Sequence, residues 1–239
     1  MLSLSSLFSR PRRLDYNGMT DWHCHILPGV DDGVADMETS LSILDEYEKM
    51  GIKEVWLTPH IMEDIPNTTS GLKERHEDLL SAYKGPIIIC LAAENMIDSL
   101  FYDRLANNDL LPIGHRNNML LVETNTFNAP IDFENTLKDI RHKGYYPLLA
   151  HPERYAYIHT LRDYQKLKEI GVRFQLNLLS LTGFYGKTAM EKSHKIMKSG
   201  MYDTFGSDLH MPEQLLYLNQ LSLKKESSHL LQCIQTTTL

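Results

Sequence analysis

The stretch Met19–His60, MTDWHCHILPGVDDGVADMETSLSILDEYEKMGIKEVWLTPH, carries the pattern on which the fold prediction depends. Its apolar run Met19–His25 is typical of a strand, Asp36–Met50 has helical spacing, and Lys53–Leu57 is a second apolar run. Gly51 follows the helical segment directly, and glycine at that position is the usual left-handed end of a helix. The stretch therefore predicts a strand, a helix and a second strand.

The same unit recurs along the rest of the chain. The further predicted strands are Pro86–Leu91, Asn118–Val122, Pro147–Ala150, Val172–Asn177 and Tyr202–Gly206. The further predicted helices are Gly71–Tyr83, Ile97–Asn107, Asp132–Lys143, Leu161–Ile170 and Lys187–Ser199. Seven such units with continuously apolar strands predict an α/β fold whose parallel sheet is covered by helices on its outside.

A closed barrel is favoured over an open, doubly wound sheet, because no glycine-rich phosphate loop follows the first strand. Residues 19–239 are expected to form this barrel domain, with a closing helix and a frayed end in Met211–Leu239. Residues 1–18 are interpreted as a flexible basic arm. Trp22 and Trp56 are expected to pack between the barrel and its helices.

Composition excludes several classes of function. The 239 residues carry a formal net charge of −7, which argues against a nucleic-acid surface. No apolar run reaches the roughly 18 residues that a transmembrane segment needs. Three cysteines have neither metal-binding nor redox-type spacing, and together with the missing secretory signal they favour a cytoplasmic protein.

Side chains that can bind metal ions stand at the ends of six predicted strands. They are His23, His25, His60, Glu94, Glu123, His151, Asp208 and His210. Because the carboxyl ends of barrel strands face one common mouth, we expect these residues to converge. Imidazoles and carboxylates without thiolates suit zinc, manganese or iron. The sequence therefore predicts a metal site at this mouth.

These motifs resemble the PHP (polymerase and histidinol phosphatase) superfamily. The segments DWHCHILPGVDDG, LTPHIM and AHPERY are similar to bacterial tyrosine-protein phosphatases of capsular and exopolysaccharide operons, and the resemblance runs from Thr20 to His210. It implies a distorted TIM-like (β/α)7 barrel with three divalent ions, often manganese, with iron or zinc as alternatives. It also implies phosphotyrosine on a partner bacterial tyrosine kinase as the substrate.

The resemblance implies three groups of ligands. The first ion takes His23, His25, Glu94 and Asp208; the second shares Glu94 and adds Glu123 and His151; the third takes Asp32, His60 and His210. Whether Asp31 or Asp32 is the ligand stays open at this point.

Arg154 matches the phosphate-binding arginine of the family. The alternative is a purely structural role, in which Arg154 forms a surface ion pair with Glu153 or Asp163. Asp208 or His210 is the expected general acid or base. Tyr155 and Tyr157 are expected either to line the substrate mouth or to cover the helix that follows.

The chain is therefore expected to be a hydrolase, a metal-dependent protein-tyrosine phosphatase. The alternatives are a small-molecule phosphatase, such as a histidinol-phosphate phosphatase, and a non-catalytic metal-binding protein. A covalent cysteine mechanism is disfavoured, because no cysteine begins a C-x5-R loop.

Overall fold

The computed structural model describes residues 11–235. The strands are β1 (Arg12–Arg13), β2 (Thr20–Cys24), β3 (Glu54–Leu57), β4 (His60–Ile61), β5 (Ile88–Leu91), β6 (Glu94–Met96), β7 (Met119–Glu123), β8 (Tyr146–Ala150), β9 (Arg173–Asn177), β10 (Thr204–Gly206) and β11 (Ser222–Leu223). The α-helices are α1 (Met37–Met50), α2 (Thr69–Ala82), α3 (Ser99–Asn107), α4 (Phe133–His142), α5 (Leu161–Glu169), α6 (Gly186–Lys198), α7 (Gln214–Gln220) and α8 (Lys225–Gln235). Two short 3-10 helices are η2 (Pro152–Arg154) and η3 (Leu178–Thr182).

Local sequence explains where the helices begin and end. Asp36 caps α1 by accepting a hydrogen bond from the Thr39 N–H at 2.8 Å, and Gly51 ends the helix with a φ of 84°. Thr160 and Asp163 form a reciprocal capping box at the start of α5. Such caps satisfy backbone groups that the first turn of a helix leaves without partners.

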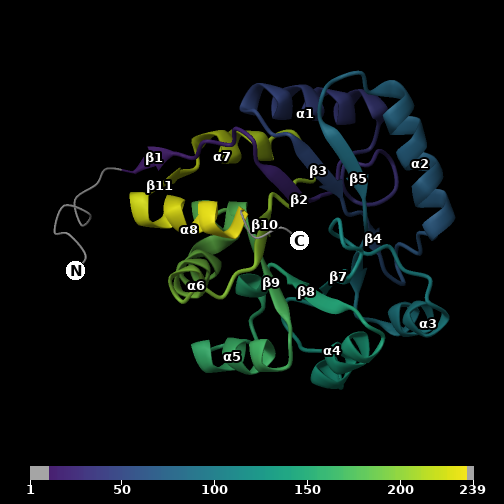
Figure 1. Ribbon diagram of the computed structural model, residues 1–239, viewed down its shortest axis with the longest axis vertical. Coiled ribbons are helices and arrows are strands. Elements are labelled where there is room, and N and C mark those ends of the chain that lie inside the picture. Colours follow the sequence, from purple (N-terminus) through teal and green to yellow (C-terminus); the bar gives the residue numbers. More distant parts are fainter. Residues whose placement is uncertain (1–10, 236–239) are drawn as a thin grey trace.

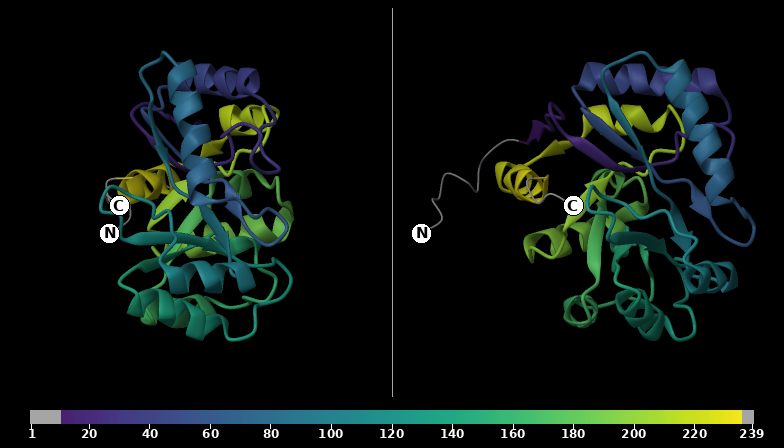
Figure 2. Two further views of the ribbon diagram at one scale, coloured as in Figure 1. Left: turned by 90° about the vertical axis from the view of Figure 1, so that its right-hand side faces the viewer. Right: turned by 45° about the vertical axis from the view of Figure 1, so that its right-hand side comes forward.

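The strands form a curled parallel barrel with the helices outside it (Figure 1). One sheet has the order β10-β9-β8-β7-β6-β4 and the other β2-β3-β5, and every pairing in both is parallel. β4 continues β3 and β6 continues β5, so each of these pairs counts as one strand of the barrel. The barrel therefore has seven strands, which follow one another in sequence order. The two further views in Figure 2 show the same arrangement from the side. The predicted α/β barrel is confirmed.

The ring closes between its first and last strands. Cys24, at the end of β2, forms a parallel bridge with Leu209, three residues beyond β10. The Asp208 N–H donates to the His23 carbonyl at 2.8 Å, and the His25 N–H donates to the Leu209 carbonyl at 2.8 Å. The two segments that carry His-x-His and Asp-x-His therefore lie side by side.

Two apolar layers follow from the alternation of side chains along the strands. Leu120, Val122 and Leu149 point outward and join the core beneath the helices. Leu121 and Leu148 belong to a separate cluster inside the barrel.

Trp22 and Trp56 lie in the inner cluster, with their rings stacked 5.7 Å apart. The expectation that they pack between barrel and helices was therefore wrong. The register between β2 and β3 shifts between Asp21 and Cys24, and a bulge of this kind re-aims side chains. Two consecutive residues of β2, Trp22 and His23, consequently both face the interior.

The segment before the barrel is partly described. Arg12–Arg13 pairs antiparallel with Ser222–Leu223, and the hydroxyl of buried Tyr16 donates to the Leu218 carbonyl at 2.8 Å. The rest of the predicted arm, residues 1–10, lies outside the described residues, and the domain boundary at residue 19 stays a prediction. The expected closing helix is instead two helices, α7 and α8, separated by β11. Within residues 11–235, no helix has the length and apolar character to cross a bilayer.

Candidate metal centre

The structure brings all nine predicted ligands together at the carboxyl ends of the strands. His23 and Glu123 lie within β2 and β7, His60 and Glu94 begin β4 and β6, and the others lie in the connections that follow β2, β8 and β10. His151 and Asp208 hold positive φ angles, of 36° and 54°, immediately beyond their strands. Such angles are uncommon outside glycine and cluster at functional sites.

Glu94 stands at the centre of the cluster. Its Oε2 lies 3.2 Å from His23 Nε2, 3.3 Å from His25 Nε2 and 3.3 Å from His60 Nδ1. Its Oε1 lies 3.2 Å from His151 Nε2, and the side chain is fully buried. Burial opposes ionisation, but His23 and the other imidazoles hold the pKa of Glu94 well below its ordinary value.

Three overlapping groups of ligand atoms are compact enough to hold an ion, each with all atoms within 4.8 Å of one another. They are His23, His25, Glu94 and Asp208; His25, Asp32, His60 and His210; and His60, Glu94 and Glu123. The group with His23 is identical to the ligand set predicted for the first ion. The group with His210 contains all three ligands predicted for the third ion and adds His25.

The remaining group differs from the predicted second set. It includes His60, whose Nδ1 lies 3.0 Å from Glu123 Oε1, whereas His151 Nε2 lies 3.7 Å from Glu123 Oε2. His60 therefore stands between two groups, because its Nε2 lies 3.5 Å from Asp32 Oδ1.

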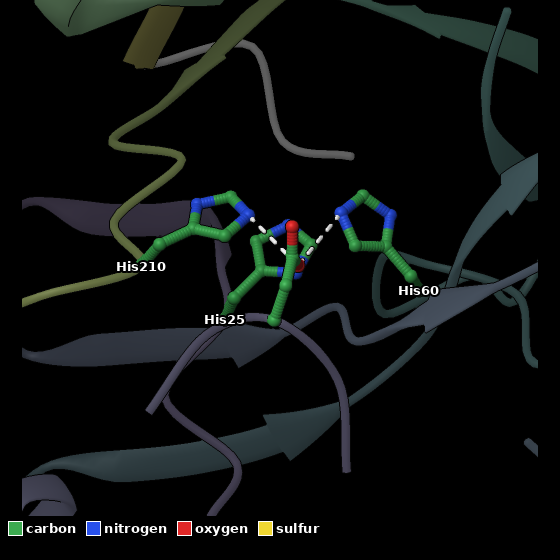
Figure 3. A group of neighbouring side chains, drawn as sticks. His25, His60 and His210 are labelled. Carbon is green, nitrogen blue, oxygen red and sulfur yellow. Dashed lines mark ion pairs between the residues drawn. The ribbon is translucent and has the colours of Figure 1, made fainter. Parts of the chain in front are cut away.

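Figure 3 shows the imidazoles of His25, His60 and His210 turned toward one another. Asp32 Oδ1 lies 3.5 Å from His60 Nε2 and 3.6 Å from His210 Nε2. Asp31 points elsewhere: its Oδ2 accepts from His25 Nδ1 at 2.8 Å and from the His60 N–H at 3.0 Å. Of the two neighbouring aspartates, Asp32 thus has the geometry of a ligand and Asp31 that of a support.

Three of the histidines have an oxygen atom opposite Nδ1, so Nε2 is the nitrogen that faces the cluster. The Nδ1 of His23 faces Gln175 Oε1 at 2.6 Å, that of His25 faces Asp31, and that of His210 faces the Asp208 carbonyl at 2.9 Å. A ring nitrogen opposite an oxygen acceptor carries the proton, which leaves the other nitrogen free to bind a metal.

The structure also tests whether cations fit. The Nε2 atoms of His23 and His25 lie 3.0 Å apart, so a cation, either a proton or a metal ion, is needed to offset the repulsion between their lone pairs. Several buried atoms that face the cluster have no hydrogen-bond partner, namely both Glu94 oxygens, Glu123 Oε1 and His60 Nδ1. Burying such groups unsatisfied is costly. Divalent ions would satisfy both requirements, so the cluster fits metal.

Arg154 joins the cluster through Asp208. Its Nη1 donates to Asp208 Oδ2 at 2.8 Å, and its guanidinium lies 4.2 Å from the centre of the Tyr185 ring. Burial opposes the charge of Arg154, but Asp208 raises its pKa above the ordinary value. The surface pair with Glu153 or Asp163 does not form, since Glu153 is buried and Asp163 caps α5.

Some supporting residues escaped the sequence analysis. Asn177 Nδ2 donates to Asp208 Oδ2 at 2.7 Å, Tyr185 Oη donates to the same oxygen at 3.4 Å, and Gln175 orients His23. Gln175 and Asn177 alternate at the end of the one predicted strand without an assigned ligand, but amide side chains at a strand end are too common to mark a site by themselves. Tyr155 is fully buried, and its hydroxyl accepts from the Thr124 N–H, so it supports the fold and does not line the mouth.

Residues 19–215 match the protein family described as capsular polysaccharide synthesis, CpsB/CapC. The chain belongs to the CpsB/CapC family. It is 29% identical over 197 residues to the tyrosine-protein phosphatase YwqE of Bacillus subtilis, a match that covers 80% of this chain and 77% of YwqE. It is 25% identical over 210 residues to the tyrosine-protein phosphatase CpsB of Streptococcus pneumoniae, covering 80% and 83%.

Solved structures agree with this membership in the CpsB/CapC family. A structure from a study of YwqE and S. pneumoniae CpsB, described as unique metal-dependent tyrosine phosphatases, superimposes with a TM-score of 0.77 at 26% identity, covering 92% of this chain and 96% of that one. Histidinol phosphate phosphatase from Lactococcus lactis superimposes with a TM-score of 0.52 at 13% identity, covering 91% and 92%. This second likeness shows the shared fold alone.

Proposed function

We propose that this CpsB/CapC protein is a metal-dependent protein-tyrosine phosphatase that acts on a partner tyrosine kinase in capsular or exopolysaccharide synthesis. The observation that carries the proposal is the convergence of nine ligand-type side chains and Arg154 at one barrel mouth. The relatives YwqE and CpsB, which are named tyrosine-protein phosphatases, support the choice of phosphotyrosine.

The proposed cofactors are three divalent ions, with manganese first and iron or zinc as alternatives. His23, His25, Glu94 and Asp208 would hold one ion, and Glu94, Glu123 and His151 a second. Asp32, His60 and His210 would hold the third. When bound, the ions supply positive charge for the phosphate and make a strong nucleophile available at neutral pH.

The protein's own residues position the reacting groups. Asp31 and Gln175 keep His25 and His23 in the tautomer that presents Nε2 to the centre. Burial lowers the pKa of His210 to about 4, so this imidazole is neutral and able to bind metal near pH 7.

Arg154 would bind a phosphate oxygen with the guanidinium N–H groups that Asp208 does not occupy. The leaving group, a phenol with a pKa near 10, departs more readily than an alkyl alcohol. The demand on a general acid is correspondingly small. Of the expected roles of Asp208 or His210 as acid or base, we propose that of the base, because the pKa of each lies below its ordinary value.

We also propose a cytoplasmic location. The three cysteines are free, as expected of a reducing compartment. Fractionation of cells that produce a tagged chain tests this, since recovery in the periplasmic or secreted fraction would exclude it.

Turnover of three substrates tests the proposed activity. Protein reconstituted with manganese, zinc or iron should hydrolyse p-nitrophenyl phosphate and a phosphotyrosine peptide, but not histidinol phosphate, and a chelator should stop both reactions. Selective hydrolysis of histidinol phosphate would favour the small-molecule phosphatase. Metal binding without turnover of any substrate would favour the non-catalytic protein.

A further inference from the structure

A cavity of about 430 Å³ adjoins Arg154 at the mouth of the barrel. Its walls come from the loop after β7, from η2 and from the start of α6, and they include Phe127, Arg154, Tyr185 and Lys192. Each of these segments follows the carboxyl end of a neighbouring strand. The cavity therefore opens on the same side of the barrel as the metal cluster and shares Arg154 with it.

The wall of this cavity presents positive charge. The ammonium of half-buried Lys192 donates to the Tyr155 carbonyl at 2.6 Å, which uses one of its three hydrogens. Throughout residues 11–235, no carboxylate lies within ion-pair distance of this ammonium. Arg154 adds a second cation, with a single N–H bonded to Asp208.

The acidic residue in the wall, Glu153, favours the charge of Lys192 through space but forms no ion pair with it. Glu153 is buried, and its Oε1 accepts from the Asn177 N–H at 3.0 Å. Its Oε2 accepts from the Tyr202 hydroxyl at 2.9 Å. Both carboxylate oxygens thus have partners within the protein, whereas Lys192 keeps free hydrogens for a ligand.

Two aromatic side chains, Phe127 and Tyr185, also line the cavity. Phe127 is 74% exposed, and its loop is held in place because the Phe127 N–H donates to Asn125 Oδ1 at 2.9 Å. An exposed phenyl ring beside a cavity contributes little to folding, but it offers apolar area to a bound peptide. Tyr185 lies flat against Arg154 and completes this face.

We propose that this cavity is a subsite for an acidic side chain close to the phosphotyrosine, with Lys192 as the residue that determines this preference. The inference rests on the proposed phosphatase activity, in which Arg154 binds the phosphate. An extended peptide advances about 3.3 Å per residue, so a cavity that adjoins Arg154 is reached from within about three positions of the phosphotyrosine. Phe127 would cover the peptide at the same point.

A peptide panel tests the subsite. Each peptide carries one phosphotyrosine in a neutral background, with a single glutamate placed in turn at the three positions on either side and a glutamine peptide as its match. At least one position should show about two- to fivefold higher kcat/KM for glutamate than for glutamine, as expected of a half-exposed charge pair. The ratio should fall at high salt, because ions screen exposed charges.

Variants on one helix separate Lys192 from general charge. Lys192→Met should bring the ratio near one, while Lys192→Arg, which keeps the charge, should preserve it. Lys187→Met is the matched control, because Lys187 is 82% exposed, lies 3.8 Å from Glu191 and does not line the cavity. All variants should turn over p-nitrophenyl phosphate, which has no flanking residues, at the wild-type rate.

The outcomes distinguish this inference from the proposed activity. Equal kcat/KM for glutamate and glutamine at every position, with p-nitrophenyl phosphate hydrolysed, overturns the subsite alone. A glutamate preference that survives in Lys192→Met overturns the role of Lys192. Absence of turnover for p-nitrophenyl phosphate and all peptides removes the phosphatase activity, and the subsite with it.

Discussion

Replacing Arg154 by alanine should lower kcat/KM about ten- to a hundredfold. The guanidinium is 24% exposed and donates to Asp208 at 2.8 Å, so solvent screens its charge only in part. A charge-assisted hydrogen bond is worth about 1.5–3 kcal/mol, which corresponds to this range of rates. Because the charge on the phosphate is redistributed in the transition state, kcat should fall as well as KM rise.

Metal content should stay near that of the wild type in Arg154→Ala. Asp208 keeps its hydrogen bond from Asn177 Nδ2 at 2.7 Å, so its carboxylate is not left without a partner. Arg154→Lys restores the charge but not the planar donor pair, and it should recover part of the loss. Arg162→Ala is a matched control, because Arg162 pairs with Glu169 at 3.1 Å on the exposed face of α5.

Steady-state kinetics with p-nitrophenyl phosphate and a phosphotyrosine peptide, paired with metal analysis, measures these effects. An unchanged kcat/KM in Arg154→Ala with full metal content would refute the phosphate-binding role. A loss of metal equal to the loss of activity would instead assign Arg154 to positioning Asp208.

Three further results are expected. Asp31→Asn should weaken metal binding about 10- to 100-fold by loosening His25, and Asp32→Ala should remove an ion, both measured by titration with manganese. Loss of an ion in Asp31→Asn together with mere weakening in Asp32→Ala would contradict the assignment of Asp32 as the ligand. Alkylation of thiols should leave turnover intact, because burial raises the pKa of Cys24 and removes it from reagents, whereas inactivation with metals retained would reopen covalent catalysis. Burial raises the folded-state pKa of Glu153, so its favourable contribution is complete below the unfolded value of about 4.3 and is lost as pH rises through the raised value. The Tm of Glu153→Gln relative to wild type should therefore increase from pH 4 to pH 8, and a constant difference would count against this interpretation.

Much of the fold followed from local pattern. The predicted strands and helices each lie within a few residues of their observed counterparts. Each strand is a short apolar run, each helix has apolar residues at helical spacing, and several helices are followed by a glycine. The short strands β4 and β6 were missed because strands of 2 and 3 residues are too short to show a hydrophobic period of their own. β11 was missed because its partner, β1, lies at the other end of the chain and leaves no local signal.

The ligand-type side chains were visible in combination, since six strand ends carry them and the carboxyl ends of barrel strands meet at one mouth. Gln175, Asn177 and Tyr185 were not, because such residues also end strands and begin turns without any role in a site. Trp22 was misplaced because a bulge in β2 breaks the alternation on which the prediction relied. Lys192 was not identified because only the folded chain brings it beside Arg154.

The seam between β2 and the segment after β10 has a consequence for how the protein matures. Cys24 and Leu209 are bridged there, and His23 and Asp208 on either side of the seam contribute to one group of ligand atoms. An ion held by that group would cross-link the first and last strands of the barrel. Cross-links between residues far apart in the sequence remove the most conformational entropy from the unfolded chain. Loss of metal would then weaken the whole domain against unfolding. During synthesis, the four ligands of such an ion would be complete only after Asp208 has left the ribosome, that is, after translation of the last barrel strand.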